Sequence, residues 1–193
     1  MKTKFKHILV ILCLSMISCE GNLEPELFDQ ITPENFLTNE DDVKTAVTGV
    51  YAEFRGISEW GRYKTSWGSV MTLQEVPTDL WAANWFYKAH TDFMWKATDY
   101  FVCEIFEFFV PAITKATALI ARIQDAPVSD NIKNRYIAEL RVVRALWMYD
   151  LFDLYGPVPA ITDPEKILNP TQDFTVTRPS REEYITFVET ELK

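Results

Sequence analysis

The sequence predicts an all-α fold of tetratricopeptide-like stacked helix pairs joined by long irregular loops. Two observations lead to it. Apolar residues recur every three or four positions in several separate stretches, which is the pattern of a helix with one buried face. The chain is also 48% hydrophobic and 14% aromatic, which is enough apolar material for a packed core. Successive amphipathic helices of this kind bury their faces on one another in a stacked array, although no clean 34-residue repeat is visible.

The first 18 residues have the features of an export signal. Three lysines lie among the first six residues, and the apolar run 8–17 is too short to span a bilayer as a helix. Residues 16–19, Met-Ile-Ser-Cys, resemble a lipobox, which predicts cleavage before Cys19 and attachment of lipid to it. Ordinary signal cleavage, with Cys19 incidental, is the alternative. We therefore expect a signal peptide over 1–18, an acidic tether over 19–37 and a helical domain over 38–193.

Charge and rare residues narrow the possible functions. The formal net charge is −9, so nucleic acid and anionic membrane surfaces are unfavourable partners. Beyond the signal, Cys103 is the single thiol left once Cys19 carries lipid, and it is interpreted as a small buried hydrophobe. His90 is the one histidine outside the signal, which argues against a His-rich metal site or a catalytic triad with a spare histidine. No metal or cofactor is predicted, and no enzyme activity.

The first predicted helix begins at Thr38 or Asn39, either of which can cap it. Acidic residues at 40–42 suit its positive N-terminal end, and the helix is expected to reach Gly56. Its apolar face is formed by Val43, Val47, Val50, Tyr51 and Phe54.

Residues 56–91 lose this periodicity and contain many tryptophans among Gly, Ser, Asn and Pro. Such tryptophans either close the ends of helix pairs or stand exposed, as platforms for the apolar faces of pyranose rings or for a partner protein. Trp81, Asn84 and Trp85 combine flat rings with an amide within five residues. They are the candidates for ligand contact.

Residues 92–126 are predicted to be helical and deeply buried, with a break at Pro111 because proline lacks an amide hydrogen. The buried side chains are expected to include Trp95, Tyr100, Phe101, Ile105, Phe106, Phe108 and Phe109. A second apolar stripe, formed by Ile113, Ala116, Leu119, Ile120 and Ile123, follows the proline.

The central helix is predicted to begin at Ser129 or Asp130 and to end near Tyr155. Its stripe consists of Tyr136, Leu140, Val143, Trp147, Leu151 and Leu154, while Glu139 and residues 141–144 are expected to face water. Gly156 is expected at a left-handed cap position, and the prolines at 157 and 159 prevent continuation.

A long loop over 161–177 precedes a last helix. Ser180 and Glu183 have the spacing of a capping box at its start. The apolar stripe of this helix still continues at Lys193, so we expect the sequence to be the front part of a longer protein.

Four segments in order resemble the SusD/RagB family, whose members are lipid-anchored outer-membrane proteins of Bacteroidetes. Residues 138–151, AELRVVRALWMYDL, with LYGPVP at 154–159, are similar to the family's signature. Residues 46–51, 113–116 and 178–184 resemble the family's first helix, the helix before the signature and the segment after it.

This resemblance implies binding without catalysis. SusD-like proteins capture oligosaccharides or other nutrients at the cell surface and cover a SusC-like TonB-dependent transporter that imports them. Residues 76–79 resemble a family segment that precedes a tryptophan-containing sugar-contact loop. The resemblance therefore supports Trp81, Asn84 and Trp85 as glycan contacts, with Arg62 as a further candidate, in the N-terminal portion of such a protein.

Two other functions remain open. The chain could be a scaffold or lid component with no sugar binding of its own, in which case the tryptophan loop contacts the transporter. A secreted glycoside hydrolase would need two carboxylates about 5 to 9.5 Å apart, for which Glu75 and Asp79 are the nominees.

Overall fold

The computed structural model describes residues 36–55, 70–81, 87–168 and 176–193, and residues 37–193 form one packed unit. Every regular element in the described residues is a helix, so the all-α prediction is confirmed. The elements are α2 (Glu40–Ala52), η1 (Glu53–Arg55), α3 (Val70–Glu75), α4 (Lys88–Thr91), α5 (Tyr100–Asp125), α6 (Asp130–Tyr155), α7 (Pro164–Leu168) and α8 (Arg181–Glu191).

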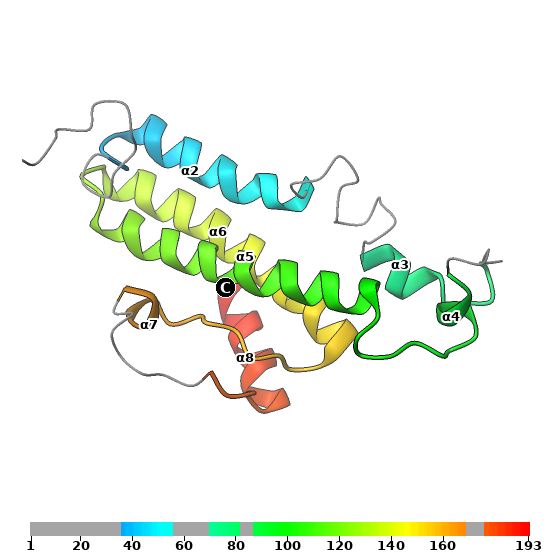
Figure 1. Cartoon of the computed structure of the whole chain (residues 1–193). Coiled ribbons are helices and arrows are strands. Elements are labelled where there is room, and N and C mark those ends of the chain that lie inside the picture. Colours follow the sequence, from blue (N-terminus) through cyan, green and yellow to red (C-terminus); the bar gives the residue numbers. More distant parts are fainter. Residues whose placement is uncertain (1–35, 56–69, 82–86, 169–175) are drawn as a thin grey trace, which may run out of the picture. The chain divides into compact units, whose positions relative to one another are not determined.

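The core lies between the long helices α5 and α6, which run side by side in Figure 1 with α2 along them. A short turn at residues 126–129 joins α5 to α6, so the two form a helical hairpin. The largest fully buried side chains come mainly from these three helices: Trp147, Phe109, Ile105, Ile113, Ile123, Leu140, Leu151, Val43 and Val47. The predicted stripe of the central helix thus lies at the centre of the core. Burial of each such side chain stabilises the fold by about 1.5–3 kcal/mol.

Helix α2 begins as predicted. The side chain of Asn39 accepts a hydrogen bond from the backbone N–H of Asp42 at 3.0 Å, so Asn39 is the cap. Val43, Val47 and Val50 are buried against the core, whereas Tyr51 is half exposed. Leu37, the last residue of the predicted tether, is 3% exposed and belongs to the core, while residues 19–35 lie outside the described residues.

Helix α5 passes through Pro111 without the predicted break. Proline cannot donate to the carbonyl of Glu107, four residues earlier, and such a loss disrupts a buried helix. Here both Glu107 and Pro111 are exposed, so water can satisfy the carbonyl and the ring points away from the core. The prediction of a break was therefore wrong because it ignored which face carries the proline.

Helix α6 ends at Tyr155, as predicted. Gly156 follows with φ 74° and ψ −161°, a region that only glycine adopts readily, and its N–H donates to Phe152 O at 2.9 Å. The positive φ is confirmed, although the residue is extended and not helical. Val158 is then fully buried, so the chain turns back onto the helices.

Arg144 does not face water, contrary to prediction. Its side chain is 6% exposed and forms an ion pair with Glu191 of α8, with Nη2 and Oε2 2.5 Å apart. It also donates to the hydroxyl of Thr117 in α5 at 2.7 Å, and Arg141 reaches the other Glu191 oxygen at 3.3 Å. Burial lowers the pKa of Arg144, and the negative charge of Glu191 opposes this shift. The four residues form a polar cluster that joins α5, α6 and α8.

Helix α8 begins with the predicted capping box. Ser180 accepts from the N–H of Glu183 at 3.2 Å, and the Glu183 carboxylate accepts from the N–H of Ser180 at 2.8 Å. Tyr184 is buried and donates to Met148 O of α6 at 2.9 Å. The predicted loop before α8 contains the short helix α7.

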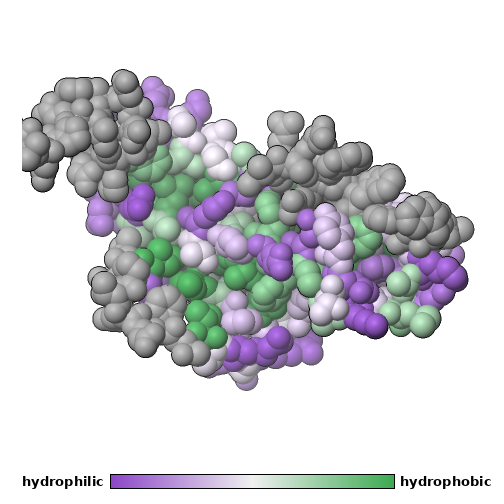
Figure 2. Space-filling model, in the orientation of Figure 1, coloured by the Kyte–Doolittle hydropathy of each residue, from purple (hydrophilic) through white to green (hydrophobic). Residues whose placement is uncertain are grey.

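None of the helices in the described ranges is long and apolar enough to cross a membrane. Figure 2 shows hydrophilic and hydrophobic residues mixed over one face of the molecule, with strongly apolar atoms gathered beside α7. At the end that carries α4, hydrophobic residues lie next to hydrophilic ones.

Candidate functional site

The candidate site is built where the short helices α3 and α4 meet one end of the α5–α6 hairpin (Figure 1). Helix α3 contacts both long helices. Its Gln74 donates to the carboxylate of Asp153 in α6 at 2.9 Å. Tyr155, the last residue of α6, donates to Val102 O in α5 at 2.8 Å. These two bonds join the three helices around the site.

Helix α4 ends in a turn that normally contains glycine. Met94 N–H donates to Ala89 O at 2.7 Å and Phe93 N–H donates to His90 O at 3.2 Å, which is the hydrogen-bond pattern of a Schellman cap. The C-cap is Asp92, and the left-handed residue that follows it is Phe93, with φ 55°. A left-handed conformation costs a residue with a side chain about 1–2 kcal/mol, and Phe93 is 68% exposed, so little packing offsets that cost. Phenylalanine at this position therefore has no evident structural benefit.

The turn folds the following residues back over His90. The Trp95 ring stacks on the His90 ring with centroids 5.9 Å apart and 14° between planes, and Phe101 meets His90 edge-on at 5.4 Å. The Phe93 ring lies next to the Trp95 ring, with centroids 5.6 Å apart and 43° between planes. Trp95 remains 41% exposed. Phe93 and Trp95 thus form an exposed pair of rings, the aromatic platform, on a base of His90 and Phe101.

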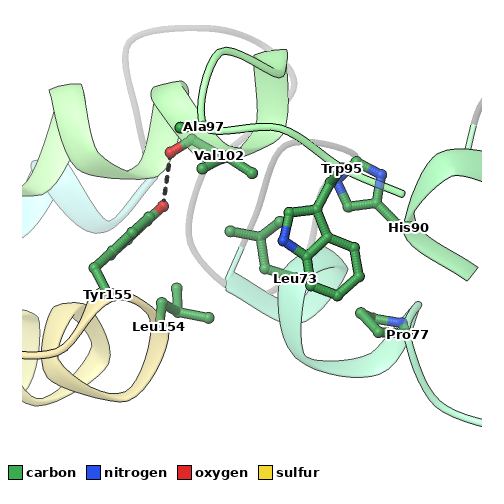
Figure 3. A pocket seen from close by; sticks show the side chains of 8 residues that line it. All are labelled: Leu73, Pro77, His90, Trp95, Ala97, Val102, Leu154 and Tyr155. Carbon is green, nitrogen blue, oxygen red and sulfur yellow. Dashed lines mark hydrogen bonds between the residues drawn. The ribbon is translucent and has the colours of Figure 1, made fainter. Parts of the chain in front are cut away.

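A half-open cavity of about 360 Å³ lies beside the aromatic platform. Figure 3 shows Trp95 and Tyr155 on opposite sides of it, with aliphatic side chains between them. We call it the Trp95 pocket. It is lined by Leu73, Pro77, His90, Trp95, Ala97, Val102, Leu154 and Tyr155. Its size falls within the range of about 300–1,000 Å³ that is common for small-molecule sites.

The eight described residues that line the pocket carry no charge near pH 7. Burial lowers the pKa of His90 below 6.5, and the negative charge of Asp99 offsets part of that shift, so the imidazole is uncharged. In the described residues neither ring nitrogen of His90 has a hydrogen-bond partner, and both are buried. Burial also raises the pKa of Tyr155, which keeps its hydroxyl protonated as the donor to Val102.

The structure describes one of the four predicted glycan contacts. Trp81 is 42% exposed and closes the turn after α3, where its N–H lies 3.5 Å from Thr78 O. It does not line the Trp95 pocket, but Pro77, four residues earlier in the same turn, does. Asn84, Trp85 and Arg62 lie outside the described residues, as does the predicted lipid site Cys19.

Phe93, Trp95 and His90 were missed as site residues. The predicted buried helix over 92–126 is wrong at its start, because α5 begins only at Tyr100, and Trp95 and Tyr100 are both exposed. Thr91 and Asp92 could have signalled the end of α4, because both are poor helix formers. No sequence pattern indicated the left-handed Phe93.

Other nominated residues lie apart from this arrangement. Glu75 ends α3 and Asp79 follows in an exposed turn, and neither lines the Trp95 pocket. Cys103 is half-buried, and its thiol donates to Ala97 O at 3.2 Å, so it is less enclosed than expected. In the part of the chain that the structure describes, no group of three or more His, Cys, Asp or Glu residues could hold a metal ion.

Comparisons with known proteins bear on the fold. No protein-family model matches the chain, and no curated protein matches it. A solved crystal structure has a similar fold, with a TM-score of 0.61 and 21% sequence identity over 81% of this chain. The match spans 29% of the length of that structure's chain. Identity at this level shows the fold alone.

Proposed function

We propose that this chain belongs to a cell-surface, lipid-anchored protein that binds oligosaccharide and delivers it to a SusC-like TonB-dependent transporter in the outer membrane. The SusD-like segments at 46–51, 113–116, 138–159 and 178–184 support this proposal. The first two lie in α2 and α5, the third covers the second half of α6 and the turn after it, and the fourth includes the start of α8. The first three segments contribute many core residues, whereas Tyr184 is the one buried residue of 178–184. On this proposal the four segments belong to the scaffold, and the ligand contacts come from other residues.

The observation that carries the binding proposal is the aromatic platform. Phe93 occupies a left-handed position that glycine would fill without strain, yet it leaves 68% of its surface exposed. A strained backbone position with an exposed aromatic side chain points to a role for the ring outside the packing of the fold. Trp95 stands beside it, and flat exposed rings stack on the apolar faces of pyranose sugars. The platform and the predicted contact Trp81 are the proposed sugar-binding surface.

Phe93→Gly gives the sharpest test, because stability and binding should change in opposite directions. Glycine relieves the left-handed strain, so stability to urea should stay the same or rise by up to about 1 kcal/mol. Removal of the ring should weaken oligosaccharide affinity, measured by calorimetry on a panel of soluble glycans. Tyr149→Ala is the matched control, since Tyr149 is a 58% exposed aromatic on α6, outside the platform.

Trp81→Ala and Trp95→Ala extend the same experiment. Both should reduce glycan affinity, while a pull-down with the transporter should be unchanged. Loss of the transporter with glycan affinity intact would favour the scaffold function instead. If Phe93→Gly, Trp81→Ala and Trp95→Ala all bind glycans like the unmodified protein, the binding surface proposed here is wrong.

The lipid anchor has an independent test. Cys19→Ser should abolish incorporation of labelled fatty acid and release the protein from the membrane fraction, because no cysteine would be left at the cleavage site. Labelling that persists in Cys19→Ser would refute the lipobox interpretation.

A further inference from the structure

The described lining residues of the Trp95 pocket offer a ligand few polar side-chain partners. Five of its eight described lining residues are aliphatic or proline: Leu73, Pro77, Ala97, Val102 and Leu154. The Tyr155 hydroxyl already donates to Val102 O, and both ring nitrogens of His90 are buried. The indole N–H of Trp95 remains, and Figure 3 shows that nitrogen on the side of the ring that faces the cavity.

Charged sugars are poorly matched to this wall. None of the eight described lining side chains carries a charge near neutral pH, since the pKa of His90 is lowered by burial. A carboxylate of a uronic acid would lose its hydration without a cation to pair with, which is strongly unfavourable. The pocket therefore favours a neutral ring.

Hydroxyl and methyl groups also differ in the free energy of burial against this aliphatic wall. A hydroxyl pressed against the aliphatic wall would lose its hydrogen bonds to water and find no replacement, whereas a methyl group gains from burial. In an ordinary hexopyranose, C1 to C4 each carry a hydroxyl, and C5 carries a CH2OH group whose hydroxyl is on C6. Two common sugar types instead carry a methyl group: 6-deoxyhexoses on C5, and N-acetylhexosamines on the acetamido group, whose carbonyl can accept from Trp95.

We propose that the Trp95 pocket selects a neutral, methyl-bearing sugar residue, with the ring on the aromatic platform and the methyl group against the aliphatic wall. This inference rests on the proposed function and adds the class of sugar. It assigns Leu73, Val102 and Leu154 to the methyl group and the Trp95 N–H to an acceptor oxygen of the ligand.

Matched monosaccharides test the selection by ligand-observed NMR titration of the whole mature chain. 6-Deoxyglucose and glucose differ only in the C6 hydroxyl, and 6-deoxyglucose should bind about 5- to 150-fold more tightly if that hydroxyl is left unpaired. The affinity for N-acetylglucosamine, compared with that for glucose, tests whether the methyl group of an acetamido substituent is recognised. Glucuronate should bind more weakly than glucose. Trp95→Phe keeps an aromatic ring but removes the N–H, so it should weaken the binding of N-acetylglucosamine and leave the binding of 6-deoxyglucose unchanged.

Ala97→Leu tests the location. Ala97 lies in an exposed segment and lines the cavity, so a larger side chain fills the cavity without disturbing a helix. The preference for 6-deoxyglucose should disappear, while Ala138→Leu on the exposed face of α6 should keep it. Equal affinity for both members of each sugar pair, with binding still sensitive to Trp81→Ala, would overturn this inference and leave the proposed function intact. Absence of binding to any monosaccharide or oligosaccharide would overturn both.

Discussion

The buried Arg144–Glu191 pair allows a quantitative test of how α8 is held. Their side chains are 6% and 7% exposed, and Arg144 donates to Glu191 through Nε at 2.6 Å as well as through Nη2 at 2.5 Å. Removal of one partner leaves the other charged and buried, which costs about 3–5 kcal/mol. Glu191→Leu should therefore lower the free energy of unfolding by about that amount, and Arg144→Met by less because Arg141 still pairs with Glu191.

The double variant should behave differently. It would place two apolar side chains opposite each other at this site, and replacement of a whole buried pair by apolar residues is often neutral or stabilising. Arg144→Met combined with Glu191→Leu is expected to lie within about 1 kcal/mol of the unmodified protein, which implies a coupling energy above about 3 kcal/mol. Arg141 limits the effect of Arg144→Met, because it still reaches Glu191 at 3.3 Å.

Urea unfolding followed by far-UV circular dichroism measures all four corners of this cycle on the mature chain. Arg135→Met is the control, since Arg135 and Glu139 form an exposed pair at 3.4 Å, and such pairs contribute about 0.3–0.5 kcal/mol. If the double variant loses as much stability as the two single variants together, the pair is not coupled and the reasoning from burial is refuted.

Single residues give three further predictions. Gly156→Ala should destabilise the protein by about 1–3 kcal/mol through backbone strain alone, since a Cβ at Gly156 meets nothing within 4 Å. Gly49→Ala inside α2 is equally uncrowded and should stabilise the protein by about 0.5–1 kcal/mol. Equal changes in the free energy of unfolding in urea for the two variants would contradict this. Pro111→Ala should raise stability by about 2 kcal/mol, because it restores a helical hydrogen bond in α5, and an unchanged melting temperature would argue against it. Because the pKa of His90 is lowered in the folded state, the unfolded state takes up the proton first, so stability should fall as pH drops below about 6.5. His90→Leu should remove that slope between pH 7 and 5, and a slope that persists would show that another group is responsible.

Sequence periodicity was sufficient for the helices whose burial is decided locally. The stripe of α6, the Asn39 cap of α2 and the capping box at Ser180 all appear as predicted, because each depends on residues within one or two turns. Arg144 could not be placed in this way, since the carboxylate that pairs with it lies 47 residues later in the chain.

The candidate site was less predictable for a related reason. Trp81 was nominated from the rings and amide near it in the sequence and from the SusD-like resemblance, and it stays a prediction, whereas Trp95 was assigned to a buried helix because aromatic residues surround it. Its exposure depends on the left-handed turn at Phe93, and a phenylalanine gives no sequence signal for such a conformation. The lining of the Trp95 pocket depends further on Leu154 and Tyr155, which lie far along the chain from the α4 turn.

The wide sequence separation of the pocket walls has a thermodynamic consequence. Leu73 and Tyr155 face the same cavity, and the residues between them supply the remaining walls. Any ligand that fills the cavity contacts α3, the α4 turn, α5 and α6 together, so it binds the folded chain and has nothing comparable to bind when these segments separate. Mass action then raises the unfolding free energy by about 2.7 kcal/mol at a ligand concentration one hundred times Kd. A rise in melting temperature with concentration would thus identify a ligand among unlabelled candidates before any sugar has been named.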